Sequence, residues 1–366
     1  MIRRLSTRLL ALSALALSAA SALSGCSGSP SGPATPAASA GSAISAERCA
    51  ENKAAGPITY ITGYQYQASA SILDVVAATQ LGYFDALCLD VTIQPGTGDT
   101  AGNAQLVAAG TATFTDLGGD ADLLRARENG VDVTGIATYG QVPIATLMTM
   151  PTVTDLKQLD GTTLGQKGQL PPEIQTMLVD AGADLSTITQ VVVGYDPSIL
   201  PRGQVQSLTG YKSNEPLTLK AQGTDVKTWN PEDYGIPGTF GTVAANPAFA
   251  KANPTATQDF LRASLHAYDQ CLTNAAECVG FAAALSGAGY DAEHNVQVWN
   301  TETGLVASGQ PTGTPVGSLN TDLLARESAF LVKGGVLATA PDLTAATDPS
   351  FVAAIYDGTS LIWPAP

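Results

Sequence analysis

Aromatic, amide and carboxylate side chains recur in short segments at predicted strand ends and turns. Aromatic faces stack on flat rings, and amide and carboxylate oxygens accept hydrogen bonds from ring amino groups. Such a set suits the binding of a flat heterocycle and needs no covalent chemistry. The candidate binding positions are Tyr64, Gln65, Tyr66, Gly98, Gly119, Asp120, Tyr139, Gln141, Asn214 and Glu215.

Each of these candidates also has a purely structural explanation. Tyr64 and Tyr66 alternate at a strand end, so one of them can pack between the lobes while the other faces a ligand. Asn214 suits the N-cap of a helix, and the helix dipole favours Glu215 in the first turn. Turn and cap roles stay equally open for Gly98, Gly119 and Asp120.

Basic residues are scarce in the first half of the chain's body. Between Ile58 and Pro143 they are only Arg125 and Arg127, on a predicted helix that we expect to face away from the candidate site. A site for sulfonate or nitrate needs positive charge or N–H donors to replace the water around the anion. The sequence therefore favours a neutral or weakly basic solute.

Short β-rich runs alternate with helical runs from Ile58 onward, a pattern typical of an α/β fold. Right-handed crossovers place the glycine-rich turns together at the carboxyl edge of a parallel sheet, where such folds bind ligands. A second unit of the same kind runs from about Ile144 to Tyr234. The chain then becomes strongly helical, with Pro254–Leu272 the clearest amphipathic stretch.

The N-terminus has the pattern of a secretory signal. Three arginines in the first eight residues precede the apolar run Leu9–Leu23. The following Ser-Gly-Cys resembles a bacterial lipobox, which implies removal of residues 1–25 and acylation of Cys26. The acyl chains would hold the protein in the bilayer on the outer face of the cell membrane. Residues 26–56 are rich in Ser, Pro, Ala and Gly and are expected to form a flexible tether.

Four further cysteines are Cys49, Cys88, Cys271 and Cys278. An even number in an oxidising compartment predicts disulfides, and three pairings are possible. The gaps favour Cys49 with Cys88 and Cys271 with Cys278. The chain has only two histidines, far from any cysteine cluster, so the sequence predicts no metal site and no cofactor.

Charge and composition exclude a nucleic-acid partner. The 366 residues carry a net charge of -15, which becomes -18 once the leader's three arginines are removed. Nucleic-acid binding requires a basic surface. Charged residues make up only 13% and hydrophobic residues 45%, so we expect a packed globular body instead of a disordered acidic chain. We also expect the protein to be a monomer.

Several segments, in chain order, resemble the NMT1/THI5-like group of periplasmic-type solute-binding proteins. They include AATQLGYFDALCLDV at 77–91, AQLVAAGTATF at 104–114, DLKQLDG at 155–161 and FAKANP at 249–254. The resemblance covers roughly Ile58 to Tyr268. It implies a two-lobed α/β architecture, the type II periplasmic-binding-protein fold, with the ligand in the cleft between the lobes and an ABC permease as partner.

The resemblance also implies domain boundaries and a function. Lobe 1 would comprise residues 57–140 and 238–366, and lobe 2 residues 141–237. The expected function is that of a lipid-anchored receptor for a small heteroaromatic solute such as a thiamine-pyrimidine precursor, because Asn214-Glu215-Pro216 before a helix is similar to the pyrimidine-precursor branch. The alternatives are a sulfonate or nitrate receptor and a pyrimidine-synthase-like enzyme. The enzyme is disfavoured because those synthases depend on a first-lobe histidine and a cysteine-rich metal motif that this sequence lacks.

Overall fold

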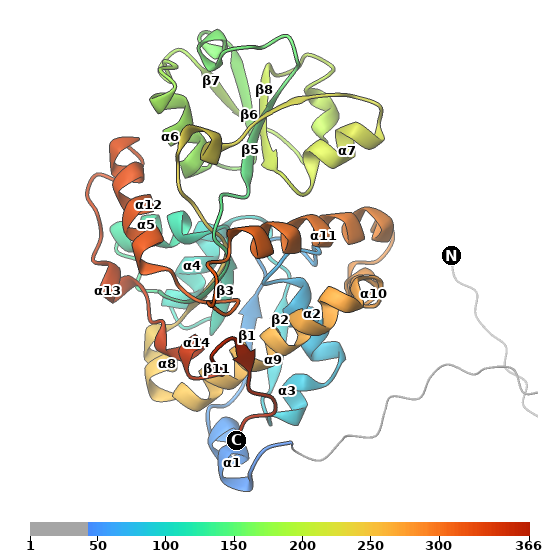
Figure 1. Ribbon diagram of the computed structural model, residues 1–366, viewed down its shortest axis with the longest axis vertical. Coiled ribbons are helices and arrows are strands. Elements are labelled where there is room, and N and C mark those ends of the chain that lie inside the picture. The colour runs from blue at the N-terminus through green and yellow to red at the C-terminus, as the bar shows by residue number, and fades with distance from the viewer. Residues whose placement is uncertain (1–42) are drawn as a thin grey trace, which may run out of the picture. The chain divides into compact units, whose positions relative to one another are not determined.

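The computed structural model describes residues 43–366, which form an α/β body with two five-stranded sheets (Figure 1). We call the part built around the first sheet lobe 1 and the part built around the second sheet lobe 2. The expected signal peptide, the acylation site Cys26 and residues 27–42 of the expected tether lie outside the described residues. Within residues 43–366, no helix combines the length and the apolar character that a bilayer span requires.

The sheet of lobe 1 has the strand order β2-β1-β3-β10-β4. β1 pairs in parallel with both of its neighbours, whereas β10 runs antiparallel to β3 and β4. The strands are β1 (Ile58–Ile61), β2 (Val91–Gln94), β3 (Phe114–Leu117), β4 (Thr134–Gly140) and β10 (Phe240–Ala245).

Successive side chains of this sheet enter two different apolar layers, as the period of two requires. Tyr60 and Phe114 lie opposite each other on paired strands, and both rings contact Phe260 of α9, with ring centroids 5.5 and 4.5 Å apart. Ile61 and Leu117 face the other layer, which α4 and α5 cover. The helices are α2 (Leu73–Gln80), α3 (Tyr83–Ala86) and α9 (Pro254–Thr273) in the first layer, and α4 (Thr100–Ala108) and α5 (Asp120–Glu128) in the second.

The sheet of lobe 2 has the order β7-β6-β8-β5-β9 and also carries helices on both faces (Figure 1). Leu147 and Met148 are successive residues of β5, yet Leu147 packs with α6 and Met148 with α7. The strands are β5 (Ala145–Thr149), β6 (Thr163–Gln166), β7 (Thr189–Val192), β8 (Ser207–Tyr211) and β9 (Lys227–Trp229). The helices are α6 (Pro172–Asp180) and α7 (Glu215–Ala221), with 3-10 turns at Leu156–Leu159, Pro197–Ile199 and Pro231–Tyr234.

Two connections, residues 141–144 and 230–239, join the lobes. The strands that follow them, β5 and β10, run antiparallel to the strands beside them. A strand that arrives from the other lobe starts at the edge where the parallel strands end, so it must run in the opposite direction. Both sheets are therefore mixed, whereas the sequence predicted parallel sheets. The Lys212 ammonium joins the two connections, since it donates to the Pro143 carbonyl at 2.5 Å and to Glu232 at 2.6 Å.

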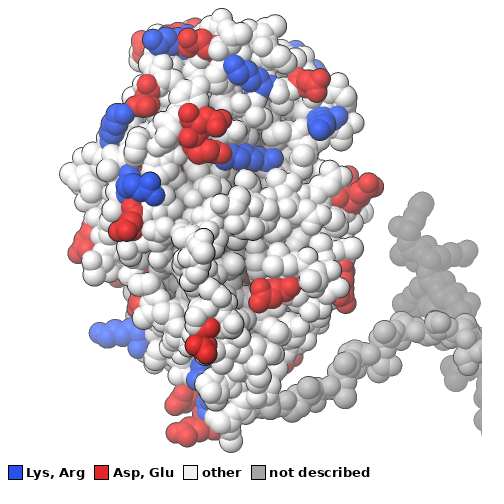
Figure 2. Space-filling view, in the orientation of Figure 1, with Lys and Arg blue, Asp and Glu red and all other residues white. Residues whose placement is uncertain are grey.

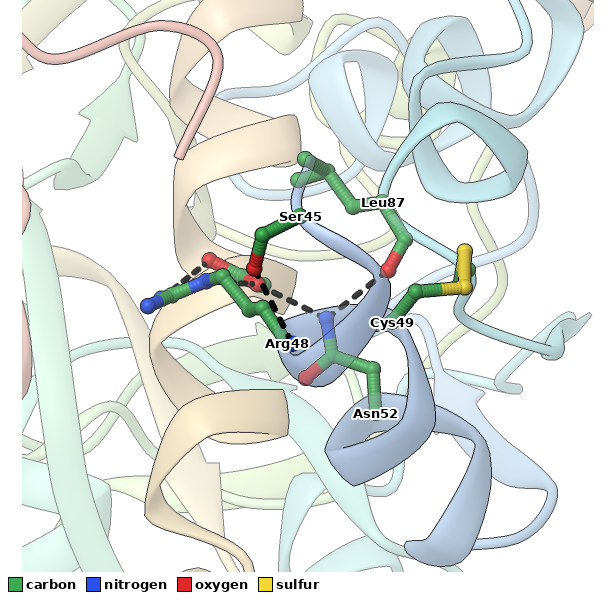
Figure 3. The surroundings of a disulfide bond; sticks show 7 residues. Ser45, Arg48, Cys49, Asn52 and Leu87 are labelled. Carbon is green, nitrogen blue, oxygen red and sulfur yellow. Dashed lines mark hydrogen bonds and ion pairs between the residues drawn. A yellow bond between two sulfur atoms is a disulfide. The ribbon is translucent and has the colours of Figure 1, made fainter. Parts of the chain in front are cut away.

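Part of the segment that the sequence assigned to a tether is helical. Residues 46–54 form α1 (Ala46–Ala54), and the Ser45 hydroxyl caps it by accepting the Arg48 N–H at 3.2 Å. Cys49 forms a disulfide with Cys88, one of the two pairs that the gaps favoured (Figure 3). The sequence of α1 is polar and was therefore assigned to the tether. The contacts that hold this helix come from residues distant in the chain, so they could not be predicted from its own sequence.

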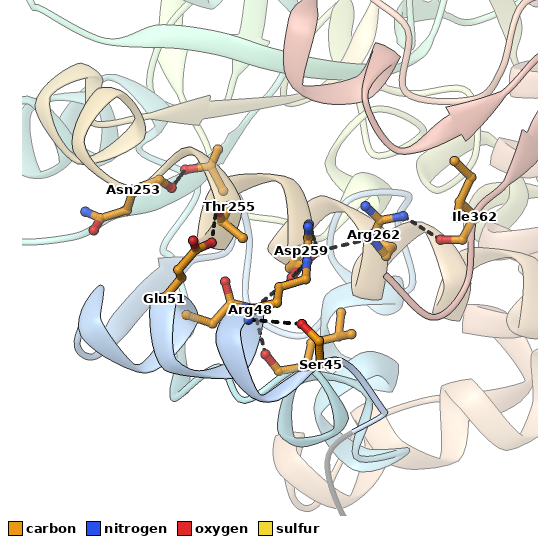
Figure 4. A network of polar contacts seen from close by, with 11 residues as sticks. Ser45, Arg48, Glu51, Asn253, Thr255, Asp259, Arg262 and Ile362 are labelled. Carbon is orange, nitrogen blue, oxygen red and sulfur yellow. Dashed lines mark hydrogen bonds and ion pairs between the residues drawn. The ribbon is translucent and has the colours of Figure 1, made fainter. Parts of the chain in front are cut away.

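A buried carboxylate anchors α1 to α9. Asp259 accepts two hydrogen bonds of 2.8 Å from the Arg48 guanidinium and one of 2.7 Å from Asn52 (Figure 4). Arg262 donates to the same carboxylate at 3.1 Å and to the carbonyl of Ile362 at 2.6 Å. A buried charge requires such a set of donors. One carboxylate therefore connects α1, α9 and the C-terminal segment.

The chain after β10 is largely helical, as predicted. Cys271 at the end of α9 forms a disulfide with Cys278, the other favoured pair. The last part of α12 contacts lobe 2: Lys333 forms an ion pair with Asp180, and Gln175 donates to the Gly334 carbonyl at 3.4 Å. The elements are α8 (Pro247–Ala252), α10 (Ala275–Ser286), α11 (Ala292–Gly309), α12 (Thr321–Lys333), α13 (Leu343–Ala346), α14 (Ser350–Ala353), β11 (Tyr356–Asp357) and β12 (Ser360–Leu361).

Candidate binding site between the lobes

A cavity of about 150 Å³ lies where the parallel strands of both lobes end. In lobe 1 its lining comes from the segments that follow β1, β2 and β3, and in lobe 2 from those that follow β6, β7 and β8. Carboxyl ends of parallel strands are where open α/β sheets bind ligands. The lining side chains used below are Tyr64, Thr100 and Asp122 of lobe 1 and Lys167, Gln169, Glu173, Tyr195, Tyr211, Asn214 and Glu215 of lobe 2.

Two tyrosines from opposite lobes meet at one wall of the cavity. The ring centroids of Tyr64 and Tyr195 are 4.5 Å apart at an interplanar angle of 33°. The Tyr195 hydroxyl donates to the Thr97 carbonyl of lobe 1 at 3.2 Å. Gly98 has a φ of +93°, and a Cβ there would lie 2.7 Å from the Tyr195 hydroxyl oxygen. This position therefore requires glycine for its backbone conformation and for the close approach of Tyr195.

A third tyrosine, Tyr211, spans the cavity from the end of β8. Its hydroxyl reaches lobe 1, where a Cβ on Gly118 would lie 3.6 Å from it. Tyr211 lines the cavity. Burial raises the pKa of Tyr211, with nearby carboxylates adding to the rise, so the hydroxyl stays protonated and is available as a donor.

The charges of the cavity are mainly acidic. Asp122, Glu173 and Glu215 line it, and among the described lining residues Lys167 is the single Lys or Arg. Lys167 forms an ion pair with Glu215, which also accepts the Tyr211 N–H at 2.7 Å. Burial lowers the pKa of Lys167 to about 8. The one lysine is thus already paired with a carboxylate.

Asp122 and Glu173 stand in the first turns of α5 and α6. The Thr100 hydroxyl lies 3.3 Å from the Asp122 carboxylate and donates to it. Burial raises the pKa of Asp122. Glu173 is 7% exposed, and burial raises its pKa to about 7, with a further rise from the charge of Asp122. These acids bind protons more readily than carboxylates in water do.

Helix α11 holds the lobe 2 segment that contains Asn214 and Glu215. His294 on α11 forms a hydrogen bond of 2.7 Å with the Asn214 side-chain oxygen. Glu302 on the same helix is 1% exposed and accepts the Ser213 hydroxyl at 2.8 Å. The start of α7 is therefore positioned by side chains from the C-terminal part of the chain, for which the sequence offered no motif.

The structure brings half of the sequence-predicted positions to the cavity. Those that line it are Tyr64, Gly98, Gly119, Asn214 and Glu215. The other five, Gln65, Tyr66, Asp120, Tyr139 and Gln141, do not line it.

Each position outside the cavity has a visible structural role or is exposed. Tyr139 is fully buried, donates to Asp74 and packs against Tyr268. Asp120 accepts the hydroxyls of Thr138 and Thr242 at 2.8 and 2.6 Å. Gln141 bonds with Asn320 at 2.8 Å and with the Ser318 carbonyl, which ties the first connection to the C-terminal part. Tyr66 packs against the lobe 1 core, and Gln65 is exposed.

Sequence reasoning missed four of the charged and aromatic lining residues: Asp122, Lys167, Glu173 and Tyr195. Each follows the carboxyl end of a parallel strand. The signal that could have found them is the rule that open α/β sheets bind ligands at these strand ends. Arg125 was expected to face away from the site; it lies outside the cavity lining but donates to Gln169 of the lining at 3.0 Å.

The described residues offer no arrangement for a metal ion. Within residues 43–366, no three His, Cys, Asp or Glu side chains are grouped so that they could hold one. His266 stacks on Trp363, with ring centroids 4.1 Å apart, far in the chain from the lining. The arrangement of the cavity instead offers aromatic faces, carboxylate acceptors and tyrosine donors to a small molecule.

Comparison with known proteins places the chain in a family. A model described as "NMT1/THI5 like" matches residues 69–278. The chain is similar to the formylaminopyrimidine-binding protein of Halalkalibacterium halodurans, with 29% identity over 210 residues, 55% of this chain and 63% of that protein. It is also similar to the riboflavin-binding protein RibY of Chloroflexus aurantiacus, with 27% identity over 194 residues, 50% of this chain and 51% of that protein. The chain thus spans less than two thirds of the length of these relatives.

Solved structures establish the fold. The periplasmic sulfonate-binding protein SsuA of Methylobacillus flagellatus superposes with a TM-score of 0.59 at 18% identity, over 81% of this chain and 93% of that one. At this identity the similarity shows the fold alone, and it confirms the predicted two-lobed, type II periplasmic-binding-protein fold. Since the family model matches more than half of its residues, the chain belongs to the NMT1/THI5-like family.

Proposed function

We propose that this protein is the solute-binding protein of an ABC importer and that its solute is a small heteroaromatic compound rich in hydrogen-bond donors. The fold supports the first part, because two lobes around a cleft trap a small solute by closing on it. Two relatives support the second part, since one is named for a formylaminopyrimidine and the other for riboflavin, both flat nitrogen heterocycles.

The observation that carries this proposal is the combination, in the cavity, of tyrosine rings and of acids that form no ion pair with a described Lys or Arg. Tyr64, Tyr195 and Tyr211 supply aromatic surface from both lobes. Asp122 and Glu173 supply acceptors for ring amino groups, and the lysine of the lining is paired with Glu215. A flat ring that donates through amino groups matches this lining.

A sulfonate or nitrate solute fits the same lining poorly. Its negative charge would enter a cavity that holds three carboxylates and, among the described lining residues, one paired lysine. The face of the molecule in Figure 2 also shows large uncharged stretches and no concentration of Lys and Arg that would attract anions. Sulfonate binding by a protein of the same fold is therefore not support for a sulfonate solute here.

Within the proposal, Tyr64, Gly98, Gly119, Asn214 and Glu215 stay assigned to solute contact, together with Tyr195 and Tyr211. The lipid anchor on Cys26, the leader of residues 1–25, the tether and the permease partner belong to the same proposal. The protein would then work at the extracytoplasmic face of the membrane and would carry out no reaction on its solute.

Native mass spectrometry of the full chain, purified without refolding, tests the function. We expect a mass adduct of heterocycle size that disappears after partial unfolding and dialysis. A thermal-shift panel of aminopyrimidines, riboflavin, taurine and nitrate then assigns the class. Stabilisation by taurine or nitrate, with none by pyrimidines or riboflavin, contradicts the proposed solute. Consumption of the solute by the purified protein would instead favour the enzyme.

A further inference from the structure

Two carboxylates, one from each lobe, line the same cavity, and within residues 43–366 neither of them forms an ion pair with a Lys or Arg. Asp122 belongs to α5 of lobe 1 and Glu173 to α6 of lobe 2, and both line the cavity of about 150 Å³. Their charges interact, because the negative charge of Asp122 makes ionisation of Glu173 less favourable. Like charges that line one cavity oppose each other.

Glu173 is the more telling member of the pair. Its side chain is more than nine-tenths buried and lines the cavity. Among residues 43–366, its carboxylate has no hydrogen bond from another residue; the donor in reach is its own backbone N–H. Burying a carboxylate with so few donors is unfavourable unless a partner arrives. A position in the first turn of a helix explains an acid there, but not its burial against an open cavity.

The nearby cations are each engaged with other groups. Lys167 pairs with Glu215, Lys212 pairs with Glu232, and Arg125 donates to Gln169. Arg125 and Lys212 act on Glu173 through weaker electrostatic attraction, and Arg125 attracts Asp122 in the same way without forming an ion pair with it.

A further acid lies behind the pair, and burial raises its pKa well above the usual carboxyl value, so it is held protonated. Glu327 on α12 is fully buried, and in the described part of the chain neither of its carboxylate oxygens has a side-chain hydrogen-bond partner. The charges of Asp120, Glu173 and Asp122 all act on it. Protonation of Glu327 avoids a third negative charge beside Asp122 and Glu173, so the attraction for a positively charged group comes from these two acids.

We propose that Asp122 and Glu173 form the specificity determinant of the cavity: together they select solutes that carry a cationic or amidine-like donor group, which bridges the two lobes by bonding to both carboxylates. This inference rests on the proposed function, because it assumes that the cavity holds the solute. The ring of the solute would stack at the tyrosine wall while its basic group reaches the acids. A charged donor that satisfies two carboxylates makes strong, short hydrogen bonds.

Three pyrimidines that share one ring test the charge preference by calorimetric titration. They are 4-aminopyrimidines with a 5-aminomethyl group (cation), a 5-hydroxymethyl group (neutral) and a 5-carboxylate (anion). We expect the wild-type protein to bind the cation at least tenfold more tightly than the neutral compound, with the anion weakest. Asp122→Asn and Glu173→Gln should each reduce the affinity for the cation about tenfold and leave the neutral compound within about threefold. Asp132→Asn, at an exposed acid of lobe 1, is the matched control and should change none of the three affinities.

A second measurement needs no ligand. Because Glu173→Gln removes one of the two opposed charges, the ligand-free variant should melt at a higher temperature than the wild type at pH 8. Equal affinity of the wild type for the three pyrimidines, unchanged cation affinity in both variants, or no binding of the aminomethyl compound overturns the inference. The proposed function survives each of these results if the neutral pyrimidine or riboflavin still binds, and it fails if taurine or nitrate binds in their place.

Discussion

The Glu302 carboxylate joins the two lobes through Ser213, whose hydroxyl donates to it at 2.8 Å. On the lobe 1 side, the Ser69 hydroxyl and the Ala70 N–H donate to the same carboxylate at 3.0 and 2.9 Å. Ser213 directly precedes Asn214 and Glu215, which line the cavity. A buried side chain of α11 therefore sets the position of a cavity wall in lobe 2.

Replacing Glu302 with Gln should weaken both the fold and the site. The amide can still accept from the Ala70 N–H, but its NH₂ group faces the Ser69 and Ser213 hydroxyls, which must turn from donors into acceptors, so the buried hydrogen bonds become weaker. We expect a loss of about 1–3 kcal/mol in the free energy of unfolding and a severalfold loss of solute affinity, measured by urea denaturation and calorimetry. The control is Glu293→Gln on the exposed side of α11. Equal behaviour of the two variants would show that Glu302 does not couple the lobes.

The stability of the protein should fall as pH rises toward neutrality. Burial raises the pKa of Asp74, Glu173 and Glu302 to about 7 each, well above the values of these carboxyls in an unfolded chain. The folded state therefore holds protons more tightly than the unfolded state, and the free energy of unfolding decreases between about pH 4 and pH 7. Melting temperatures measured from pH 5 to pH 8.5 should fall throughout that range, because burial raises the pKa values of Asp116 and Glu327 well above the usual carboxyl range and these groups keep the slope negative above pH 7.

Asp74→Asn provides the check on that pH dependence. The variant keeps an acceptor for the Tyr139 hydroxyl and removes one of the titrating groups. Its melting temperature should depend less steeply on pH than that of the wild type. A melting temperature that rises from pH 5 to pH 7 in the wild type is incompatible with these three carboxyls being protonated in the fold.

Tyr195 should contribute to binding more than to folding. Its side chain is 47% exposed and contacts Tyr64 across the cleft. Tyr195→Ala removes a ring from the wall, so we expect about a tenfold loss of solute affinity and a nearly unchanged melting temperature. Tyr195→Phe keeps the ring, loses the hydrogen bond to Thr97 and should retain most of the affinity. Solute binding by the Ala variant at wild-type strength would exclude stacking at this wall.

Asp259 should be one of the most sensitive positions for stability. Asp259→Asn leaves the Arg48 and Arg262 guanidinium groups facing a neutral amide in a buried setting. Breaking a buried ion pair in this way costs about 3–5 kcal/mol, which urea denaturation measures. Asp269→Asn, at an exposed position of the same helix, is the control and should change stability by less than about 1 kcal/mol. A loss of similar size in both variants would mean that the network does not anchor α1.

The fold was largely predictable because its signals are local. Pro254–Leu272 was predicted as a helix from its apolar period, and α9 spans Pro254–Thr273. The two disulfide pairs favoured by the cysteine gaps are the ones present. Helix α1 escaped prediction because its polar sequence has no apolar stripe, and it is held by Cys88 and Asp259, residues distant in the chain.

The site was predictable only in part, because its geometry is set by tertiary structure. Tyr139 was predicted to contact the solute, but the alternation of β4 turns its ring into the lobe 1 core, on the same strand face as Ala137. Glu173 and Tyr195 carry no local sequence signature. They reach the cavity because the segments that follow β6 and β7 line it together with the segments that follow the parallel strands of lobe 1. Glu302 is distant in sequence from Ser69 of lobe 1 and Ser213 of lobe 2. Helix α11 places it between these two residues.

Calorimetric titration of the full chain with a formylaminopyrimidine and with taurine, under the same conditions, tests the central claim most directly. The account predicts binding of the pyrimidine at one molecule per chain and no measurable heat with taurine. Saturable binding of taurine at one molecule per chain, with none of the pyrimidine or of riboflavin, would contradict it.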